Sequence, residues 1–289
     1  MTEKERIRQE FLRQRVQDLC LMDDVFMTKV FGESPACTQL VLRIILGIED
    51  LVVERVQVQY SLQNMHKRSV RLDVLATDKS GKKYNIEIQR DSRGAGARRA
   101  RYNSSLIDAD MTLPGDDFNS LAEVYVIFIT EKDYFGDGLP LYTIERTIRE
   151  NSRAFGDGSY IIYVNGENRD DTQLGQLMHD FFCSKPAEMV YKELADEARY
   201  WKEDAKGANI MSESLRAMFL ELMADECAEA RAEGVAAGTA EGKIEGIEIG
   251  VKLLIEAMAK SGKYSAQEIA DLYKLGETDV LHRSDSAQN

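Results

Sequence analysis

The sequence predicts a mixed α/β fold, with helices on both faces of a β-sheet, followed by a helical C-terminal extension. Two helical segments come first. Three strands of alternating apolar and polar residues follow, and then come a helix and further strands. From about residue 205 onward the patterns are only helical, and no proline occurs between residues 213 and 260. This order is typical of an α/β core with an appended helical segment.

The first two elements are expected to be helices. Residues 3–31 begin with a polar stretch and continue with apolar residues at helical spacing up to Gly32. Pro35 suits the first turn of a second helix, and Gly47 suits its end because glycine readily adopts the left-handed conformation. We therefore expect two consecutive helices before the first strand.

Strand patterns follow these helices. Segments 52–60, 71–77 and 84–89 alternate apolar and polar residues as half-buried strands do. The last two flank residues 77–81, TDKSG, whose composition predicts a turn, so they should pair as a hairpin. The nearly all-apolar segment 123–130 predicts a central strand buried on both faces. Further strands are expected at 141–148 and 159–165, and further helices at 95–110, 171–183 and 186–204.

Composition is that of a soluble globular protein. Hydrophobic residues make up 44% and charged residues 30% of the 289 positions. No apolar run approaches the roughly 18 to 20 residues that span a bilayer. The N-terminal residues lack the apolar segment of a signal peptide, so a cytoplasmic location is expected. The four cysteines and three histidines are scattered, which disfavours a zinc site, a disulfide framework and catalysis by either residue type.

Charge is distributed unevenly along the chain. The formal net charge of −13 is unfavourable for binding nucleic acid. Between Lys82 and Arg101, however, seven basic residues accompany only two acidic ones, Glu87 and Asp91. A local basic strip on an acidic body is compatible with DNA as a partner but does not establish it.

Two carboxylates are expected to meet on the predicted hairpin. Side chains alternate faces along a strand, so Leu72 and Val74 should share the apolar face opposite to Asp73. Pairing through the turn at 77–81 then places Asp73 beside Glu87. A carboxylate among apolar strand residues is costly unless it is paired or binds a metal. The alternative is an ordinary amphipathic hairpin with its polar face in water, and spacing alone favours that alternative.

These carboxylates also form a ligand set for a hard divalent cation. Asp73 and Glu87, together with the backbone carbonyl of Ile88 and water, would give Mg²⁺ or Mn²⁺ an all-oxygen environment. Gln89 points to the same face of the strand as Glu87 because the two residues are two positions apart.

Several short motifs surround these residues: DDVF (23–26), KVFG (29–32) and RLDVLATDKSGKKYNIEIQR (71–90). They are followed by Arg98, Tyr102, Ser104 and Leu106, and by the segments 123–130 and 160–165. In these motifs and their order the chain resembles the PD-(D/E)XK nuclease superfamily, specifically its transposase-associated branch, the recombination-promoting nucleases. The resemblance covers roughly residues 20–205 and, more loosely, the glycine-spaced tail. The resemblance implies a restriction-endonuclease-like fold, with a mixed β-sheet core flanked by helices.

The resemblance also implies a role for each matching residue. Asp73 and Glu87 would be metal ligands. Asp24 occupies the acidic position of the first helix, where it would approach the metal, cap the helix or form an ion pair. Gln89 stands where the superfamily motif has lysine. Glutamine can orient the attacking water but cannot neutralise charge, so the reaction would depend more on the metal.

The implied mechanism is metal-assisted hydrolysis. Bound Mg²⁺ or Mn²⁺ would lower the pKa of a water molecule and polarise a phosphoryl oxygen, and Gln89 would position the water. Arg98, one turn before Tyr102 on the same helix face, would offset charge on the phosphate. Arg99 and Tyr102 are further candidates for contact with DNA. The alternative for the two arginines is simple surface solvation.

The expected function is therefore that of a Mg²⁺-dependent deoxyribonuclease, an endonuclease that hydrolyses phosphodiester bonds. Promotion of recombination is what the resemblance implies. The alternative is a nuclease-like fold retained as a binding or assembly module with weak or no catalysis. The acidic charge balance and the missing lysine favour this alternative, whereas the presence of Asp73 and Glu87 opposes it. A transposase that joins strands would need a further catalytic acid, which we do not identify.

Three regions are expected: a nuclease-like domain at 1–205, a long helix at 206–260, and a short helical hairpin with a tail at 261–289. Glycine recurs at every fourth position in the long helix, at Gly234, Gly238, Gly242, Gly246 and Gly250. Each costs a helix about 1 kcal/mol relative to alanine, so the repeat calls for an explanation. It indicates either a self-association surface, and hence a homo-oligomer, or a repeat expansion in a solvated helix, and periodicity does not separate the two.

Overall fold

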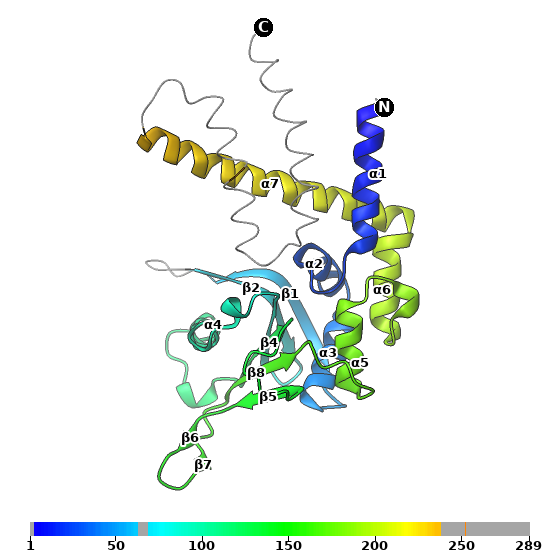
Figure 1. The fold of residues 1–289 in the computed structure, drawn as a ribbon. Helices are drawn as coiled ribbons and strands as arrows, with labels where there is room; N and C mark the ends of the chain where they lie inside the picture. Colours follow the sequence, from blue (N-terminus) through cyan, green and yellow to red (C-terminus); the bar gives the residue numbers. More distant parts are fainter. Residues whose placement is uncertain (1–2, 63–68, 238–251, 253–289) are drawn as a thin grey trace. The chain divides into compact units, whose positions relative to one another are not determined.

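A computed structural model describes residues 3–62, 69–237 and 252 of the chain (Figure 1). The chain divides into two compact units, Met1–Ser212 and Glu213–Asn289. The first unit contains all strands found in the described residues, together with every candidate site residue considered above.

The N-terminal region contains two helices where one was expected. Helix α1 covers Glu3–Asp18 and helix α2 covers Asp24–Glu33, so the prediction of a continuous helix over 3–31 is wrong. The cause is the segment 19–22, in which all four side chains are buried; four consecutive residues cannot all face one side of a helix. Asp23 closes the turn, because its carboxylate accepts a hydrogen bond from the backbone N–H of Cys20 at 2.7 Å. Helix α3, Pro35–Leu46, ends as predicted at Gly47, whose φ is +67°.

The core is a six-stranded mixed sheet in the order β1-β2-β3-β4-β8-β5. Strands β1 (Val53–Leu62), β2 (Val70–Asp78) and β3 (Lys83–Gln89) form an antiparallel meander, which contains the predicted hairpin of β2 and β3. Strands β3, β4 (Val124–Thr130) and β8 (Ser159–Asn165) are parallel, and β5 (Leu141–Ile144) pairs antiparallel with β8. The mixed sheet flanked by helices confirms the predicted α/β class and is consistent with a restriction-endonuclease-like fold.

The predicted strand at 141–148 is divided. Strand β5 ends at Ile144, which pairs with Ile161 near the start of β8, and the chain then leaves the sheet. Strands β6 (Thr147–Ile148) and β7 (Arg153–Ala154) form a separate two-stranded hairpin of exposed residues. The prediction of a single strand is wrong, because the chain leaves β8 after Ile144 and pairs with itself in the hairpin of β6 and β7.

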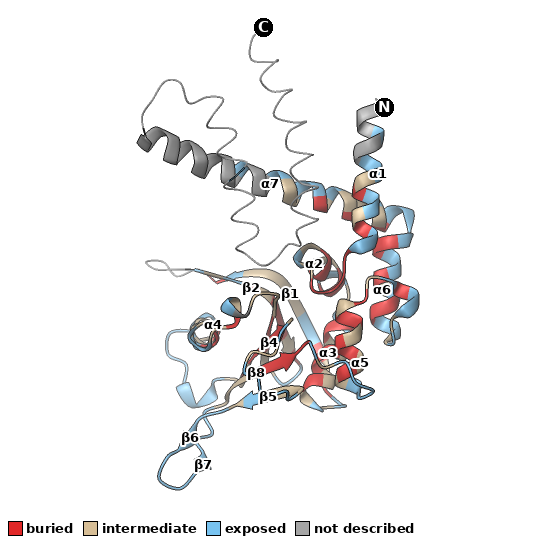
Figure 2. Cartoon of the chain, viewed as in Figure 1, coloured by how far each residue is buried: buried red, intermediate tan, exposed pale blue. Residues whose placement is uncertain are grey.

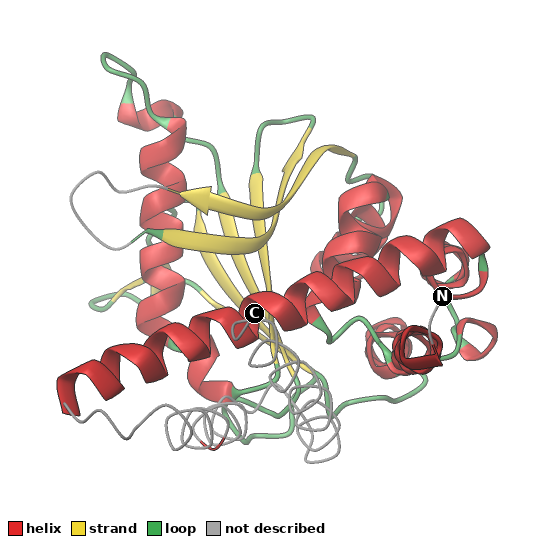
Figure 3. Ribbon diagram, turned by 90° about the horizontal axis from the view of Figure 1, so that it is seen from above, coloured by secondary structure: helices red, strands yellow, loops and turns green. Residues whose placement is uncertain are grey.

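Helices cover both faces of the sheet (Figures 1 and 3). Helix α4 (Ala97–Met111) lies on one face, over a buried cluster that includes Leu72, Leu75, Val126 and Phe128. The opposite face is covered by α2, α3 and α5 (Gln173–Phe182), and α6 (Lys192–Glu203) packs against α2 and α3. Figure 2 shows buried residues concentrated on the sheet and on the inward sides of these helices. Three short 3₁₀ turns, at Ser92–Ala95, Phe118–Ser120 and Pro186–Glu188, complete the described elements of this unit.

A buried lysine joins the helices on this second face. Lys202 in α6 is only 2% exposed, and its ammonium group donates to the backbone carbonyls of Gln17, Leu19 and Ser184. An ammonium group has three N–H donors, so each donor has one acceptor here. The contact ties α6 to the turn between α1 and α2.

Helix α7 covers Ala205–Ala237 and extends from the first unit into the second. Of the predicted glycine repeat it contains Gly234 alone; the remaining glycines, and the hairpin and tail predicted at 261–289, lie outside the described residues. The homo-oligomer and the three-region division stay predictions. Within the described part of the chain, no helix combines the length and apolar character that crossing a membrane requires.

Candidate metal centre

Asp73 and Glu87 meet where the ladder between β2 and β3 ends. The register pairs Thr77 with Lys83 and continues to Val74 opposite Ile86, so the next two residues in register are Asp73 and Glu87. At this point the carboxylate of Asp73 accepts the backbone N–H of Ile88 at 2.9 Å. A side-chain oxygen therefore takes the place of a backbone acceptor, and the two strands begin to separate.

The strands do not alternate regularly at this position. Leu72 and Leu75 belong to the same buried cluster beneath α4, although residues three apart on a regular strand face opposite sides. Val74 pairs with Val58, whose side chain lies against Gly32 of α2 on the other face. The expectation that Leu72 and Val74 share a face is therefore wrong. The backbone changes face around Asp73, which directs its carboxylate toward the gap between β2 and β3.

Glu87 is fully buried within a chain of polar groups. One of its oxygens accepts a hydrogen bond from the side-chain amide of Asn85 at 2.9 Å, and the other accepts one from the guanidinium of Arg99 at 2.6 Å. Asn103 of α4 in turn donates to the amide oxygen of Asn85 at 3.2 Å. Such a buried network is costly unless its members are satisfied, and it fixes the orientation of the Glu87 carboxylate.

The two carboxylates stand in an environment that disfavours their charge. Burial raises the pKa of Asp73 to about 7, and the neighbouring Glu87 adds to the rise. Burial also raises the pKa of Glu87, although Arg99 and the hydrogen bond from Asn85 oppose the shift. Two adjacent carboxylates with raised pKa values are a common feature of sites that bind a cation or carry out acid–base chemistry.

Helix α2 contributes a third acid whose charge acts on Asp73. Asp24 is the first residue of α2, and its negative charge is one of the causes of the raised pKa of Asp73. Its carboxylate accepts a hydrogen bond from the side-chain amide of Gln59 in β1 at 3.0 Å. Asp24 therefore acts on Asp73 through its charge, but the three acids do not form a compact ligand cluster. Among the residues described by the structure, no group of three or more histidine, cysteine, aspartate or glutamate side chains is arranged to hold a metal ion.

Gln89, which stands in place of the motif's lysine, packs against a glycine. It is the last residue of β3, pairs with Thr130 of β4, and is partly buried. A Cβ atom built on Gly94, in the 3₁₀ turn that follows β3, would collide with the amide oxygen of Gln89. The absence of a side chain at position 94 therefore determines where the Gln89 amide can lie.

The predicted DNA-contacting residues differ in position. Arg99 is the arginine of α4 that reaches the candidate site, through its ion pair with Glu87, and its side chain is 39% exposed. Arg98 is exposed, and Tyr102 is partly buried. Their contacts with DNA stay predictions.

The residues present fit a divalent cation with few protein ligands. One Asp73 oxygen accepts the Ile88 N–H, and no described residue donates a hydrogen bond to the other. Each Glu87 oxygen accepts one hydrogen bond and can accept a second interaction. The amide oxygen of Gln59 is buried without a hydrogen-bond partner among the described residues. These oxygens are of the type that Mg²⁺ and Mn²⁺ prefer.

The sequence-based prediction assigns no role to three residues that contribute to this region, namely Asn85, Asn103 and Gln59. Asn85 could have been recognised, because a polar residue two positions before Glu87 in an apolar strand faces the same side. Asn103 and Gln59 carry no such signal, since each reaches the region only through tertiary packing.

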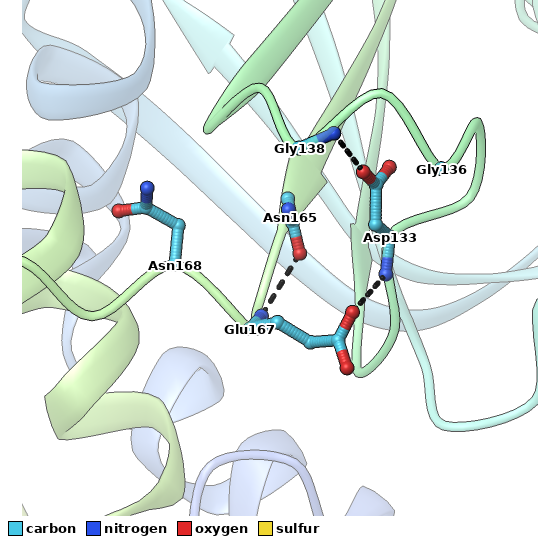
Figure 4. A pocket seen from close by; sticks show the side chains of 6 residues that line it. All are labelled: Asp133, Gly136, Gly138, Asn165, Glu167 and Asn168. Carbon is cyan, nitrogen blue, oxygen red and sulfur yellow. Dashed lines mark hydrogen bonds between the residues drawn. The ribbon is translucent and has the colours of Figure 1, made fainter.

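A separate pocket lies at the ends of β4 and β8 (Figure 4). It has a volume of about 480 Å³ and is lined by Asp133, Gly136, Gly138, Asn165, Glu167 and Asn168. The oxygens of its two acids are engaged by internal donors: Asp133 accepts the N–H of Gly138 at 2.7 Å, and Glu167 accepts the N–H of Asp133 at 3.0 Å. These bonds stabilise the loop, and the pocket does not include Asp73 or Glu87.

Comparison with known proteins identifies a family. The model of the family described as "PD-(D/E)XK nuclease family transposase" matches residues 24–172, just over half of the chain. The matched range runs from the first residue of α2 to the loop after β8, and thus contains the whole candidate centre. Searches of curated proteins and of solved structures found no match.

Proposed function

The chain belongs to the PD-(D/E)XK nuclease family transposases, and on this premise we propose that it is a metal-dependent endonuclease that hydrolyses phosphodiester bonds of DNA. The observation that carries the proposal is the meeting of Asp73 and Glu87 at the point where β2 and β3 separate. The fully buried Glu87 and the half-buried Asp73 lie side by side at this opening with one positive partner, Arg99, for the pair, and burying the remaining negative charge is costly unless a further counter-charge is present. A divalent cation provides that counter-charge.

In this proposal each residue has a defined task. Asp73, Glu87 and the backbone carbonyl of Ile88 would hold the cation. When bound, Mg²⁺ or Mn²⁺ would supply a water of lowered pKa and charge stabilisation for the phosphoryl oxygens. The Gln89 amide would orient the attacking water. Arg99 lies next to Glu87 and supplies the positive charge that Gln89 lacks, so it would act on the phosphate in place of the motif's lysine.

Cleavage of supercoiled plasmid with Mg²⁺ or Mn²⁺ tests the proposal. The isosteric variants Asp73→Asn and Glu87→Gln should each lose at least about a hundredfold in rate, because each removes a ligand charge. Glu54→Gln, an exposed acid on β1, is the matched control and should cut like the unmodified protein. Undiminished cutting by Asp73→Asn or Glu87→Gln would overturn the assignment.

A second candidate is a nuclease-fold module that binds or assembles without cutting. The ion pair between Arg99 and Glu87 favours it, because the pair already satisfies the buried glutamate in the absence of a metal. Calorimetric titration with Mn²⁺ separates the candidates, since a module of this kind has no need of a cation. The endonuclease proposal also includes four further expectations: DNA as the partner, promotion of recombination, a cytoplasmic location, and self-association through the C-terminal helix.

A further inference from the structure

Gln59 has an unusual backbone conformation at the level of Asp73. Its φ is +51°, and the only other non-glycine residue with a positive φ in the described ranges is Ser152. In β1, Val58 pairs with Val74 and Tyr60 pairs with Leu72, so Gln59 lies across from Asp73. Residues other than glycine, asparagine and aspartate rarely adopt a positive φ, and such strain is found most often at functional sites.

The positive φ of Gln59 interrupts the regular alternation of side chains along β1. The side chain of Val58 lies against Gly32 of α2, whereas the hydroxyl of Tyr60 donates to Asp110 of α4 at 3.2 Å. These two residues would share a face on a regular strand, but here they reach helices on opposite faces. Strand β2 changes face at Asp73 in the same way, so both strands are distorted at one level.

The side-chain amide of Gln59 is only half satisfied. Its nitrogen donates to the carboxylate of Asp24 at 3.0 Å and to the hydroxyl of Thr28 at 3.2 Å. Its oxygen is buried and accepts no hydrogen bond from a described residue. The carboxylate of Asp24 fixes this orientation, because a reversed amide would place oxygen against oxygen. The contact with α2 thus accounts for the hydrogen bonds of the amide nitrogen. It accounts neither for the buried amide oxygen nor for the strained backbone.

We propose that the amide oxygen of Gln59 is a third side-chain ligand of the divalent cation held by Asp73 and Glu87. The inference rests on the metal centre proposed above and extends its ligand set to β1. An amide oxygen is a ligand that Mg²⁺ and Mn²⁺ accept. Being neutral, it adds no repulsion to a region where Asp24 already lies near Asp73. The strained backbone delivers this oxygen, and the hydrogen bond to Asp24 holds the amide so that its oxygen is available.

The test measures Mn²⁺ binding by calorimetry without DNA, together with thermal unfolding in EDTA. Gln59→Gly removes the ligand, and relief of the positive φ offsets part of the loss of the hydrogen bonds to Asp24 and Thr28. The variant should therefore stay folded in EDTA while its Mn²⁺ affinity falls about tenfold or more. Gln59→Asn tolerates the backbone conformation but shortens the side chain, and it should lose affinity similarly. Thr28→Val is the control: it removes one hydrogen bond to the Gln59 nitrogen, leaves the oxygen in place, and should bind Mn²⁺ like the unmodified protein.

The outcomes distinguish failure of the Gln59 ligand from failure of the proposed metal centre of Asp73 and Glu87. Mn²⁺ binding that is lost in Asp73→Asn but unchanged in Gln59→Gly and Gln59→Asn would overturn the role of Gln59 and leave the metal centre intact. Absence of Mn²⁺ binding in the unmodified protein would overturn both. Reduced affinity in the two Gln59 variants, with Thr28→Val unchanged, is the expected result.

Discussion

Replacement of Arg99 by methionine should have opposite effects on metal binding and on DNA cleavage. Glu87 is fully buried and Arg99 is 39% exposed, and one guanidinium hydrogen bond of 2.6 Å joins them. A hydrogen bond to a charged group contributes about 1.5 to 3 kcal/mol, and the exposure of Arg99 places this one near the lower end, at about 2 kcal/mol. Without a metal, Arg99→Met should therefore destabilise the protein, because it leaves a buried carboxylate unpaired.

The size of the effect can be measured by thermal unfolding. In a unit of this size, about 2 kcal/mol corresponds to a fall in melting temperature of roughly 4 to 8 °C. With saturating Mn²⁺ the fall should shrink by at least half, since the cation supplies the charge that Arg99 supplied. Mn²⁺ affinity should rise because the competing cation is gone, whereas plasmid cleavage should fall because the phosphate loses a positive partner.

Arg98→Met is the matched control, because Arg98 precedes Arg99 on the same helix and is exposed. It should leave the melting temperature and the Mn²⁺ affinity unchanged. An equal loss of stability for Arg99→Met in EDTA and in Mn²⁺ would refute the reasoning, since Arg99 and the metal would then not share Glu87.

Four further expectations concern the pH dependence of metal binding and of stability, the Gly94 contact, and the buried lysine. Because burial raises the pKa of Asp73 to about 7 from an ordinary 3.8, Mn²⁺ affinity measured by calorimetry should rise about tenfold per pH unit up to pH 7 and then level off; a flat profile would contradict this. In the metal-free protein the folded state retains this proton after the unfolded chain has lost it, so the free energy of unfolding from urea titrations should fall between about pH 4 and 7, by at most about 4 kcal/mol. Gly94→Ala should displace the Gln89 amide and slow cleavage without weakening Mn²⁺ binding, whereas Gly96→Ala, where an added Cβ contacts nothing within 4 Å, should do neither. Lys202→Met removes the donor from three backbone carbonyls, of which that of Leu19 is buried, and should lower stability by about 2 to 4 kcal/mol in denaturant unfolding, with Mn²⁺ affinity unchanged; a change in affinity would show that the lysine also acts on the site.

The pairing of Asp73 with Glu87 could be predicted because it is local. The turn at 77–81 joins the two strands closely, so the hairpin leaves little freedom of register, and the observed ladder has the predicted strands. The buried strand at 124–130 was similarly predictable, because a nearly continuous apolar segment has few alternatives in a soluble protein.

The features that depend on tertiary packing could not be predicted. Arg98 and Arg99 are adjacent in sequence, and a 3₁₀ turn at Ser92–Ala95 precedes α4, so the helix phase that directs Arg99 to Glu87 is set by packing. The distortion of β1 at Gln59 is equally hidden, because glutamine rarely adopts a positive φ and nothing in the local sequence demands it. The change of face at Asp73 accompanies that distortion.

Localised cleavage of the polypeptide by bound Fe²⁺ tests the central claim most directly. Fe²⁺ placed in the Mg²⁺ or Mn²⁺ site, with ascorbate and peroxide, generates radicals that cut the backbone next to the metal. Cuts are predicted close to Asp73 and at 87–89, and Asp73→Asn should abolish them. Cuts confined to the loops that carry Asp133 and Glu167, or a pattern unaffected by Asp73→Asn, would contradict a metal centre between β2 and β3.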